Sequence, residues 1–234
     1  MNKYRKEGTQ LKALAIGLLF VLLAPLNIPA QNFASIPACE IIIDDFANGI
    51  KSAWKSKSFK GTTEYTWVTE GDKAYVRATS KAAASGLYYT IEYDAQQYPY
   101  ITWQWKVDNI IASGDALRKS GDDYAARIYV IFPSFFFWNT RAINYIWANK
   151  LPQEEAVPNP FSKNSIMIIV QSGEAETGGW IVETRNVYED YKRMFGIKPP
   201  KAGAIALMTD TDNTGESASA SYGPIAICSH DPRQ

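Results

Sequence analysis

The chain has 234 residues, of which 46% are apolar and 21% charged, and its 24 basic residues balance its 24 acidic ones. This composition lacks the basic excess that a nucleic-acid-binding surface requires. The only histidine, His230, lies close to the C-terminus, so the sequence excludes histidine-based catalytic triads and argues against a transition-metal centre.

The start of the chain predicts a cleaved secretory signal peptide over residues 1 to about 30. Four basic side chains and one acidic side chain precede the uncharged run Ala13–Ala24. That run is shorter than the roughly 20 apolar residues that span a bilayer, so we expect no transmembrane anchor after cleavage. The expected cleavage point is before Gln31. Cleavage before Cys39, which would make Cys39 a lipid-bearing N-terminus, is disfavoured by the nearby Pro37.

Residues 31–234 are predicted to form a single exported domain, in the periplasm or outside the cell. They hold 20 basic and 23 acidic residues, because the leader removes four and one, and the domain is mildly acidic. An exported compartment permits disulfides, and the only two cysteines, Cys39 and Cys228, lie near the ends of this domain. We predict a Cys39–Cys228 disulfide between adjacent first and last strands; two buried thiols are the alternative.

The hydrophobic pattern after Glu40 predicts short strands separated by turn residues, with little helix. Asn186 and Gly196 are typical caps for a helix over Val187–Phe195, and a second helix is predicted over Arg141–Asn149. The proline-containing stretch 150–162 is predicted to be a surface loop. The fold class is therefore mostly β: an antiparallel two-sheet β-sandwich of jelly-roll type with one or two short helices. The predicted strands are 40–46, 65–70, 73–79, 87–93, 100–107, 125–132, 165–171, 179–185, 203–209 and 217–228.

A first candidate site lies where a polar turn enters a strand. Asp122, Asp123 and Tyr124 precede Arg127, which shares a strand face with Tyr129. Arg127 is expected to project toward a ligand from a polar sheet face. The alternative is structural, with both aspartates capping turn amides and Arg127 in an ion pair.

A second candidate is the pair Glu183 and Arg185, two residues apart and hence on the same face of one strand. A guanidinium beside a carboxylate is suited to gripping sugar hydroxyls or a substrate carboxylate. A cross-strand ion pair is the alternative.

A third candidate is the oxygen-rich segment that holds Asp210, Asp212 and Thr214. Its alternating oxygen ligands are similar to the start of a calcium loop, but Ser221 stands where an EF-hand has its acidic twelfth residue. We therefore expect no EF-hand. The segment predicts a lone calcium site at a strand end, an Asx-stabilised turn or a ligand-binding edge that uses Asp210 and Asp212.

Aromatic residues are the fourth signal, since flat rings both stack on sugars and build β-sandwich cores. Trp138 and Trp147 are candidate stacking platforms. The run Phe135, Phe136, Phe137 and Trp138 cannot all point inward from a strand. We interpret this run first as a cleft wall and second as a docking surface for a membrane or an envelope partner.

Taken together, these motifs resemble a family of exported bacterial proteins known as domain of unknown function 3047, from about Ile41 to Ile227. The resemblance implies no activity. The opening Ile42–Phe46 with Trp54 also resembles galactose-binding-like jelly rolls and carbohydrate-binding modules, which bears on the fold. The motifs are Trp103-x-Trp105, Gly121–Arg127, Tyr145-x-Trp147, Trp180–Asn186 with Asp190-Tyr191 and Phe195-Gly196, and Thr209–Thr214.

Three functions remain open on the sequence. The leading hypothesis is an envelope protein that binds a saccharide or similar polar ligand in a groove lined by the candidate residues above. The second is a glycoside hydrolase that pairs Glu183 with Asp122, Asp123 or Asp210, or a polysaccharide lyase with Tyr124 as base and Arg127 as partner of a uronate. The third is a structural subunit of an envelope assembly.

Overall fold

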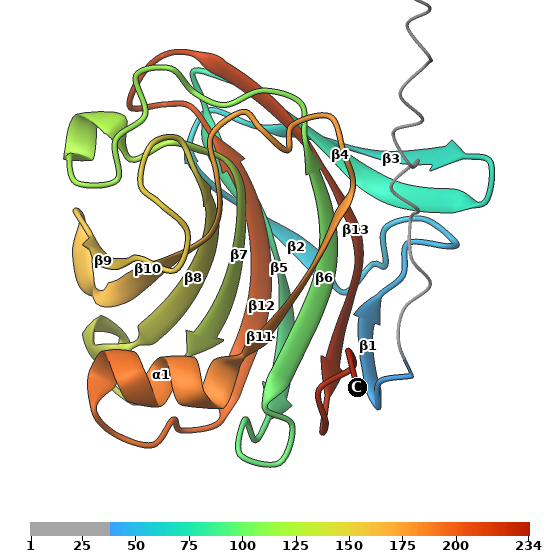
Figure 1. Cartoon of the computed structure of the whole chain (residues 1–234), viewed down its shortest axis with the longest axis vertical. Helices are drawn as coiled ribbons and strands as arrows, with labels where there is room; N and C mark the ends of the chain where they lie inside the picture. Colours follow the sequence, from blue (N-terminus) through green and yellow to red (C-terminus); the bar gives the residue numbers. More distant parts are fainter. Residues whose placement is uncertain (1–37) are drawn as a thin grey trace, which may run out of the picture. The chain divides into compact units, whose positions relative to one another are not determined.

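The computed structural model describes residues 38–234, in which two β-sheets pack against each other (Figure 1). The fold is a jelly-roll-type β-sandwich, as predicted. The six-stranded sheet has the order β11 (Ile181–Asn186), β6 (Tyr100–Val107), β13 (Ser217–Cys228), β4 (Lys73–Lys81), β3 (Glu64–Glu70), with β1 (Ile41–Asp44) also paired to β13. The seven-stranded sheet has the order β2 (Trp54–Lys60), β5 (Ala84–Tyr93), β12 (Ala202–Asp210), β7 (Tyr124–Phe132), β8 (Arg141–Ala148), β10 (Ser162–Ser172), β9 (Ala156–Asn159).

Large aromatic side chains fill the space between the sheets. Trp103 of β6 stacks on Tyr145 of β8 with ring centres 5.3 Å apart, and Trp105 lies 6.0 Å from Trp147. All four are at most 1% exposed. Their rings bury the large apolar area that holds the two sheets together.

The prediction of a helix over Arg141–Asn149 is wrong, because this segment forms strand β8. Tyr145 and Trp147 face the sandwich core, while Ile146 and Ala148 belong to a second apolar cluster on the opposite face of the sheet. A strand covered on both faces loses the polar–apolar alternation that marks a half-buried strand.

Two further strands differ from the prediction. The stretch 150–162 was expected to be a loop throughout, but it contains β9, which pairs with β10. β10 in turn runs parallel to β8, so this stretch is a crossover rather than a hairpin. β2 was not predicted, since all its residues after Trp54 are exposed and three of its seven are lysines.

The predicted helix α1 (Val187–Phe195) is confirmed, together with its caps. The Asn186 side chain accepts a hydrogen bond from the backbone N–H of Glu189 at 2.9 Å, and Gly196 ends the helix with a φ of 68°. The Glu189 side chain itself lies 3.7 Å from Lys192 Nζ, one turn along the helix.

The ends of the described chain meet in a disulfide. Cys39, just before β1, bonds to Cys228 at the end of β13, 189 residues later, as predicted. β1 pairs with β13 at this point, with Ile41 opposite Ile227. Because its thiol is in the disulfide, Cys39 cannot carry a lipid. The predicted signal peptide and its cleavage before Gln31 lie outside the described residues. Within residues 38–234, no helix is long and apolar enough to cross a membrane.

Candidate functional site

The first and third candidate segments lie side by side on the outer face of the seven-stranded sheet. Along β7, Arg127 and Tyr129 alternate with the core residues Ile128 and Val130, so they point away from the core. β12 runs antiparallel to β7, and the register places Asp210 opposite Tyr124. Strand pairing thus joins residues that are more than eighty positions apart in the sequence.

Arg127 and Asp210 form a buried ion pair with two contacts. Arg127 Nε donates to Asp210 Oδ1 at 2.8 Å, and Nη2 donates to Oδ2. The remaining donors reach the carbonyl oxygen of Asp122 at 2.7 Å and the hydroxyl of Tyr129 at 3.2 Å. The Arg127 side chain is only 3% exposed. These hydrogen bonds fix the position of the Arg127 guanidinium. The side chain therefore forms a rigid charged surface, called the floor below, rather than a mobile group.

Burial shapes the electrostatics of this pair. It raises the pKa of the Asp210 carboxyl, because the charged form loses solvation, while the Arg127 guanidinium acts in the opposite direction. Removing one partner of such a pair leaves an uncompensated buried charge, at a cost of about 3–5 kcal/mol. Arg127 and Asp210 are therefore needed for folding, and exposed neighbours are better sites for testing function.

The two aspartates before Tyr124 serve different purposes. Asp123 is fully buried and accepts hydrogen bonds from the backbone N–H of Asn213 at 3.2 Å and of Thr214 at 2.6 Å. It thereby ties down the turn between β12 and β13. Asp122 faces the other way and accepts a bond from the Asn159 side chain at 2.8 Å. Asp123 is a structural anchor, whereas Asp122 belongs to a pocket.

That pocket has a volume of about 450 Å³ and lies over the Arg127–Asp210 pair. Two rings at its edge are exposed: Phe59 of β2 at 68% and Phe161, which follows β9, at 57%. The lining residues are Phe59, Ala84, Asp122, Arg127, Tyr129, Asn159, Phe161, Ser165, Met208, Asp210, Asp212 and Asn213.

The charge of this pocket is negative. Its lining contains three carboxylates and one guanidinium. Lys60 lies at the edge of the pocket, with its Nζ 3.9 Å from Asp212 Oδ2. With this lysine included, the formal charge of the pocket is −1. An anionic ligand is therefore disfavoured relative to a neutral or cationic one.

A smaller, mainly apolar pocket of about 200 Å³ continues along the same sheet face. It shares Phe59, Tyr129 and Met208 with the first pocket and adds Tyr88 of β5. We call the two pockets together the groove. Its length across several strands suits an extended ligand more than a compact one.

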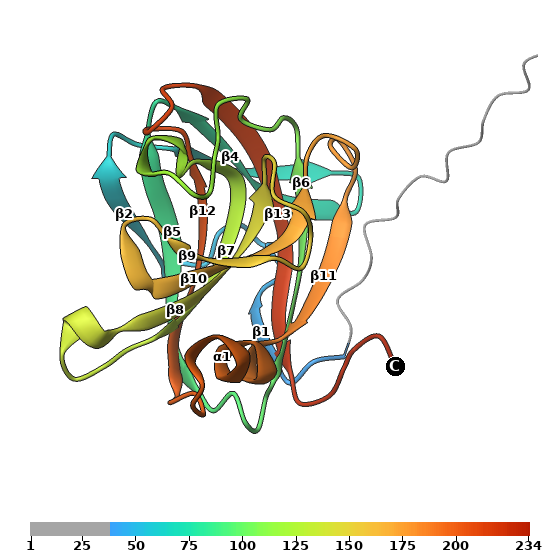
Figure 2. The same ribbon diagram turned by 60° about the vertical axis from the view of Figure 1, so that its left-hand side comes forward.

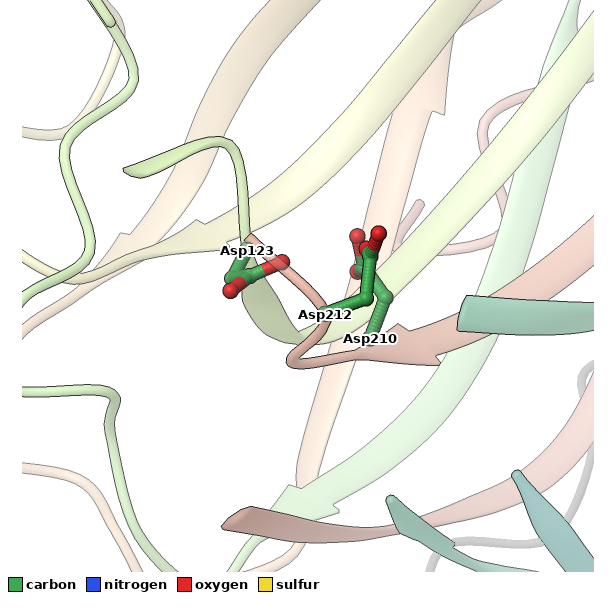
Figure 3. A group of neighbouring side chains, drawn as sticks. All are labelled: Asp123, Asp210 and Asp212. Atoms are coloured by element: carbon green, nitrogen blue, oxygen red, sulfur yellow. The ribbon is translucent and has the colours of Figure 1, made fainter. Parts of the chain in front are cut away.

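The predicted calcium ligands Asp210 and Asp212 belong to a group of acidic side chains near the groove. The carboxylates that lie together are Asp123, Asp210 and Asp212, with oxygens within 4.8 Å of one another (Figure 3). Thr214 was also predicted as a ligand, and its hydroxyl accepts a hydrogen bond from the N–H of Glu216 at 3.3 Å.

These residues do not fit a calcium ion in the described conformation. Both oxygens of Asp210 accept from Arg127, and both oxygens of Asp123 accept from the turn. Calcium takes six to eight oxygen ligands, and here a guanidinium already supplies the positive charge. The alternative stated for this segment, a hydrogen-bonded turn, agrees with these contacts.

The second candidate pair lies elsewhere. Glu183 of β11 is opposite Trp103 in the register, so it faces the space between the sheets rather than the groove. Arg185 contacts Asp190 at 3.0 Å and Glu154 at 2.7 Å. Burial raises the pKa of Glu183 to about 7, partly opposed by a hydrogen bond from Gln171. Glu183 and Arg185 close an edge of the sandwich, and they share no concavity with Arg127.

Two further expectations need correction. Trp147 is 1% exposed in the inter-sheet core and donates to the carbonyl oxygen of Gly173 at 2.9 Å, so it offers no face to a ligand. Tyr124 is fully buried against Met167, and burial raises its pKa, which is opposite to what a general base needs. With Glu183 on the other sheet, the proposed hydrolase pairings are also separated.

The aromatic run forms no wall of the groove. It lies in the turn between β7 and β8, at the end of β7 opposite to Arg127. Phe135 and Phe137 are 96% and 80% exposed, and Trp138 is 60% exposed. Physically, the tip of a hairpin has no room to bury four successive rings.

The groove residues that were not predicted from the sequence include Phe59, Asn159 and Phe161. A signal was present for two of them. Phe161 lies in the proline-containing stretch that was predicted to be a surface loop, and Phe59 stands between lysines and serines in Lys57–Lys60, although no expectation was drawn from that pattern. An exposed ring outside any core pattern is informative when it lies near polar candidates.

Comparison with known families gives a match over residues 52–226 to the family described as a protein of unknown function, DUF3047. The chain belongs to this family. The matched range contains every residue that lines the groove, from Lys57 to Asn213. No curated protein matches the chain.

Solved structures similar to the chain include carbohydrate-binding modules of Clostridium thermocellum, the likeness expected from the first strand. The family 11 module of cellulase Lic26A-Cel5E is 12% identical, with 83% of this chain and 96% of that chain covered at a TM-score of 0.44. The family 30 module of cellulase Cel9D-Cel44B is 11% identical, with 82% and 98% covered at 0.47. Cellulose induced protein Cip1 is 10% identical, with 80% and 96% covered at 0.48. Likenesses this distant do not extend to function.

Proposed function

We propose that this protein is exported and that it binds a neutral saccharide in the groove on its seven-stranded sheet. The observation that carries the proposal is the combination, in one groove, of a rigid polar floor and exposed aromatic rings. The floor is Arg127 with Asp122 and Asp210, and the rings are Phe59 and Phe161. Saccharides present hydroxyls to polar groups on their edges and C–H groups to aromatic faces, which is the pattern this groove complements.

The charge of the groove supports a neutral sugar over an acidic one. The negative balance around Asp212 repels uronates and other anionic polymers. It is compatible with glucose-type or N-acetylated units. The continuation of the groove past Tyr129 toward Tyr88 supports an oligosaccharide rather than a single ring.

The proposal predicts selective binding in calorimetric titration. Residues 31–234 are titrated with cellohexaose, chitohexaose and hexagalacturonate. We expect at least one of the two neutral hexasaccharides to bind and the anionic one to produce no saturable heat. No binding of either neutral sugar, or equal binding of the uronate, would contradict the proposal.

Substitution of the exposed groove residues tests its location. Phe161→Ala removes one stacking ring, worth about 0.5–1.5 kcal/mol, so affinity should fall roughly two- to twelvefold. Phe137→Ala is the matched control, because that ring is 80% exposed but lies outside the groove. Equal affinities for the two variants would place the ligand elsewhere.

A further inference from the structure

The aromatic hairpin between β7 and β8 is an exposed feature that the proposed saccharide site does not use. Figure 2 shows this hairpin extending beyond the sheets. Its rings contact one another: Phe136 stacks on Trp138 with centres 5.0 Å apart, and Phe137 lies 5.1 Å from Trp138. Four aromatic side chains are thus gathered on a protruding tip, although their burial would be favourable.

Uncharged residues form the tip, and cations surround its base. Pro133–Thr140 contains no charged side chain. At the base, a pocket of about 600 Å³ is lined by Arg141 and Lys198, by the polar residues Ser134, Asn139 and Asn164, and by no carboxylate. The tip and this pocket are continuous, because Ser134 and Asn139 flank the aromatic run.

The two cations of this pocket are not neutralised by the described part of the chain. Arg141 Nη1 donates to the Tyr191 hydroxyl at 3.3 Å, and the guanidinium lies 4.8 Å from the centre of the Phe195 ring. Neither contact is anionic. Within residues 38–234, no salt bridge involves Arg141 or Lys198. Positive charge is therefore available to an external anion.

We propose that this hairpin docks on an anionic phospholipid membrane, with its rings in the interfacial layer and a lipid phosphate in the pocket of Arg141 and Lys198. Aromatic side chains favour the boundary between headgroups and acyl chains. Each basic residue near an anionic surface adds about 1 kcal/mol of attraction. The apolar tip of the hairpin thus matches the interfacial layer of the bilayer, and the cationic pocket at its base matches the anionic phosphates outside that layer.

A protein partner fits the hairpin less well. A stable protein interface buries roughly 800 Å² on each partner, generally over a broad surface. A single projecting turn offers a small convex surface. It can enter a fluid interface without needing a complementary cavity on the other side.

Membrane docking and saccharide binding are compatible in space. Arg127, in the polar part of the groove, lies five residues before Phe132, where β7 leads into the hairpin. At about 3.3 Å per residue, this stretch of β7 spans roughly 17 Å. The apolar part of the groove reaches Ile131, next to the hairpin end of the strand. The docked protein would hold the polar part of its groove away from the lipid surface, and neither proposal depends on the other.

Vesicle sedimentation of residues 31–234 tests the docking. The vesicles are either phosphatidylcholine alone or phosphatidylcholine mixed with phosphatidylglycerol, which gives the vesicle a negative surface potential. We expect sedimentation with the anionic vesicles, and a loss of about tenfold or more in partitioning for Phe135→Ser/Phe137→Ser/Trp138→Ser. The control is Leu117→Ser, which removes an apolar side chain that is 64% exposed and lies outside both the hairpin and the groove; it should partition as wild type.

Two further measurements separate the parts of the proposal. Arg141→Gln/Lys198→Gln should abolish the preference for anionic over neutral vesicles. Brominated lipids should quench fluorescence in wild type but not in Trp138→Phe, which places that indole in the bilayer interface. Circular dichroism and thermal unfolding should match wild type for every variant.

Three outcomes would overturn the proposal. The first is no sedimentation with either vesicle. The second is sedimentation that the triple variant leaves unchanged. The third is self-association in gel filtration, without lipid, that the triple variant abolishes, because the hairpin would then be an interface between copies of the chain.

Discussion

At the scale of single residues, the charged side chains of this protein fall into two groups with different consequences. The Arg127–Asp210 pair is matched and buried, and it forms a floor for the groove. Glu183 is different, because it is mostly buried and the side chain that donates a hydrogen bond to it, Gln171, is uncharged. Loss of solvation then dominates, and the folded protein holds a proton on Glu183 that the unfolded chain releases.

The raised pKa of Glu183 predicts that the free energy of unfolding depends on pH. Its pKa is about 7 in the folded protein against an ordinary value of 4.5. The folded state binds the proton more tightly, so the stabilising contribution is complete below pH 4.5 and is lost as the pH rises through about 7. Relative to Glu183→Gln, wild type should lose on the order of 3 kcal/mol of unfolding free energy between these limits.

Urea denaturation of both proteins at pH 4.5 and pH 8, values on either side of the two pKa values, measures this difference. Glutamine keeps an oxygen that can accept from Gln171, so the hydrogen bond is retained and only the charge is removed. Parallel pH profiles for the two proteins would contradict the prediction.

At the scale of elements, α1 shows how local sequence signals succeed. Asn186 ends β11 and caps the helix that follows, so one side chain fixes the change from strand to helix. Replacement by alanine leaves the N–H of Glu189 without its partner.

We expect Asn186→Ala to lower the unfolding free energy by about 1 kcal/mol. Asn186→Asp is the matched control, because aspartate caps equally well and adds favourable charge at a helix N-terminus. Thermal unfolding followed by circular dichroism compares the three proteins. A midpoint for the alanine variant at or above that of wild type would show that the cap contributes nothing.

The same elements explain how far the sequence could predict the fold. Strands such as β6 and β12 carry strong β-branched and aromatic patterns and were predicted nearly to their ends. β8 was not predicted as a strand, because burial on both faces removes the polar–apolar alternation of a half-buried strand. β2 contains three lysines and two serines among its seven residues, and its place in the sheet is decided by pairing with β5 rather than by its own pattern.

The candidate site was predictable in pieces. The polar turn at Asp122 and the acidic segment at Asp210 were each recognised, but their contact depends on the register of β7 against β12, which no local pattern encodes. Trp147 was misplaced for a related reason. Its position in β8 points it into the core, and that direction could not be assigned while the segment was interpreted as a helix.

At the scale of the whole molecule, the disulfide joins the ends of the described chain. The loop that it closes spans 189 residues, nearly the whole sandwich. In the chain-entropy model, such a constraint on the unfolded state stabilises the fold by about 5 kcal/mol.

Cys39→Ser/Cys228→Ser should therefore lower the unfolding free energy by about 5 kcal/mol, with urea denaturation as the measurement. Reduced wild type should behave like the double variant, and reductant should leave the double variant unchanged. An identical urea midpoint for oxidised and reduced wild type would show that pairing of β1 with β13 alone closes the sandwich.

The crossover from β8 to β10 has a consequence for how the protein could diverge. It delivers Asn159 and Phe161 to the groove from outside the sandwich, whereas Arg127 and Asp210 come from adjacent central strands. Insertions or substitutions in the crossover would reshape one wall of the groove while the core and its ion pair stay intact. Ligand choice can thus change at Asn159 and Phe161, which makes these two positions, rather than the buried Asn149 at the start of the crossover, the natural place to engineer a new specificity.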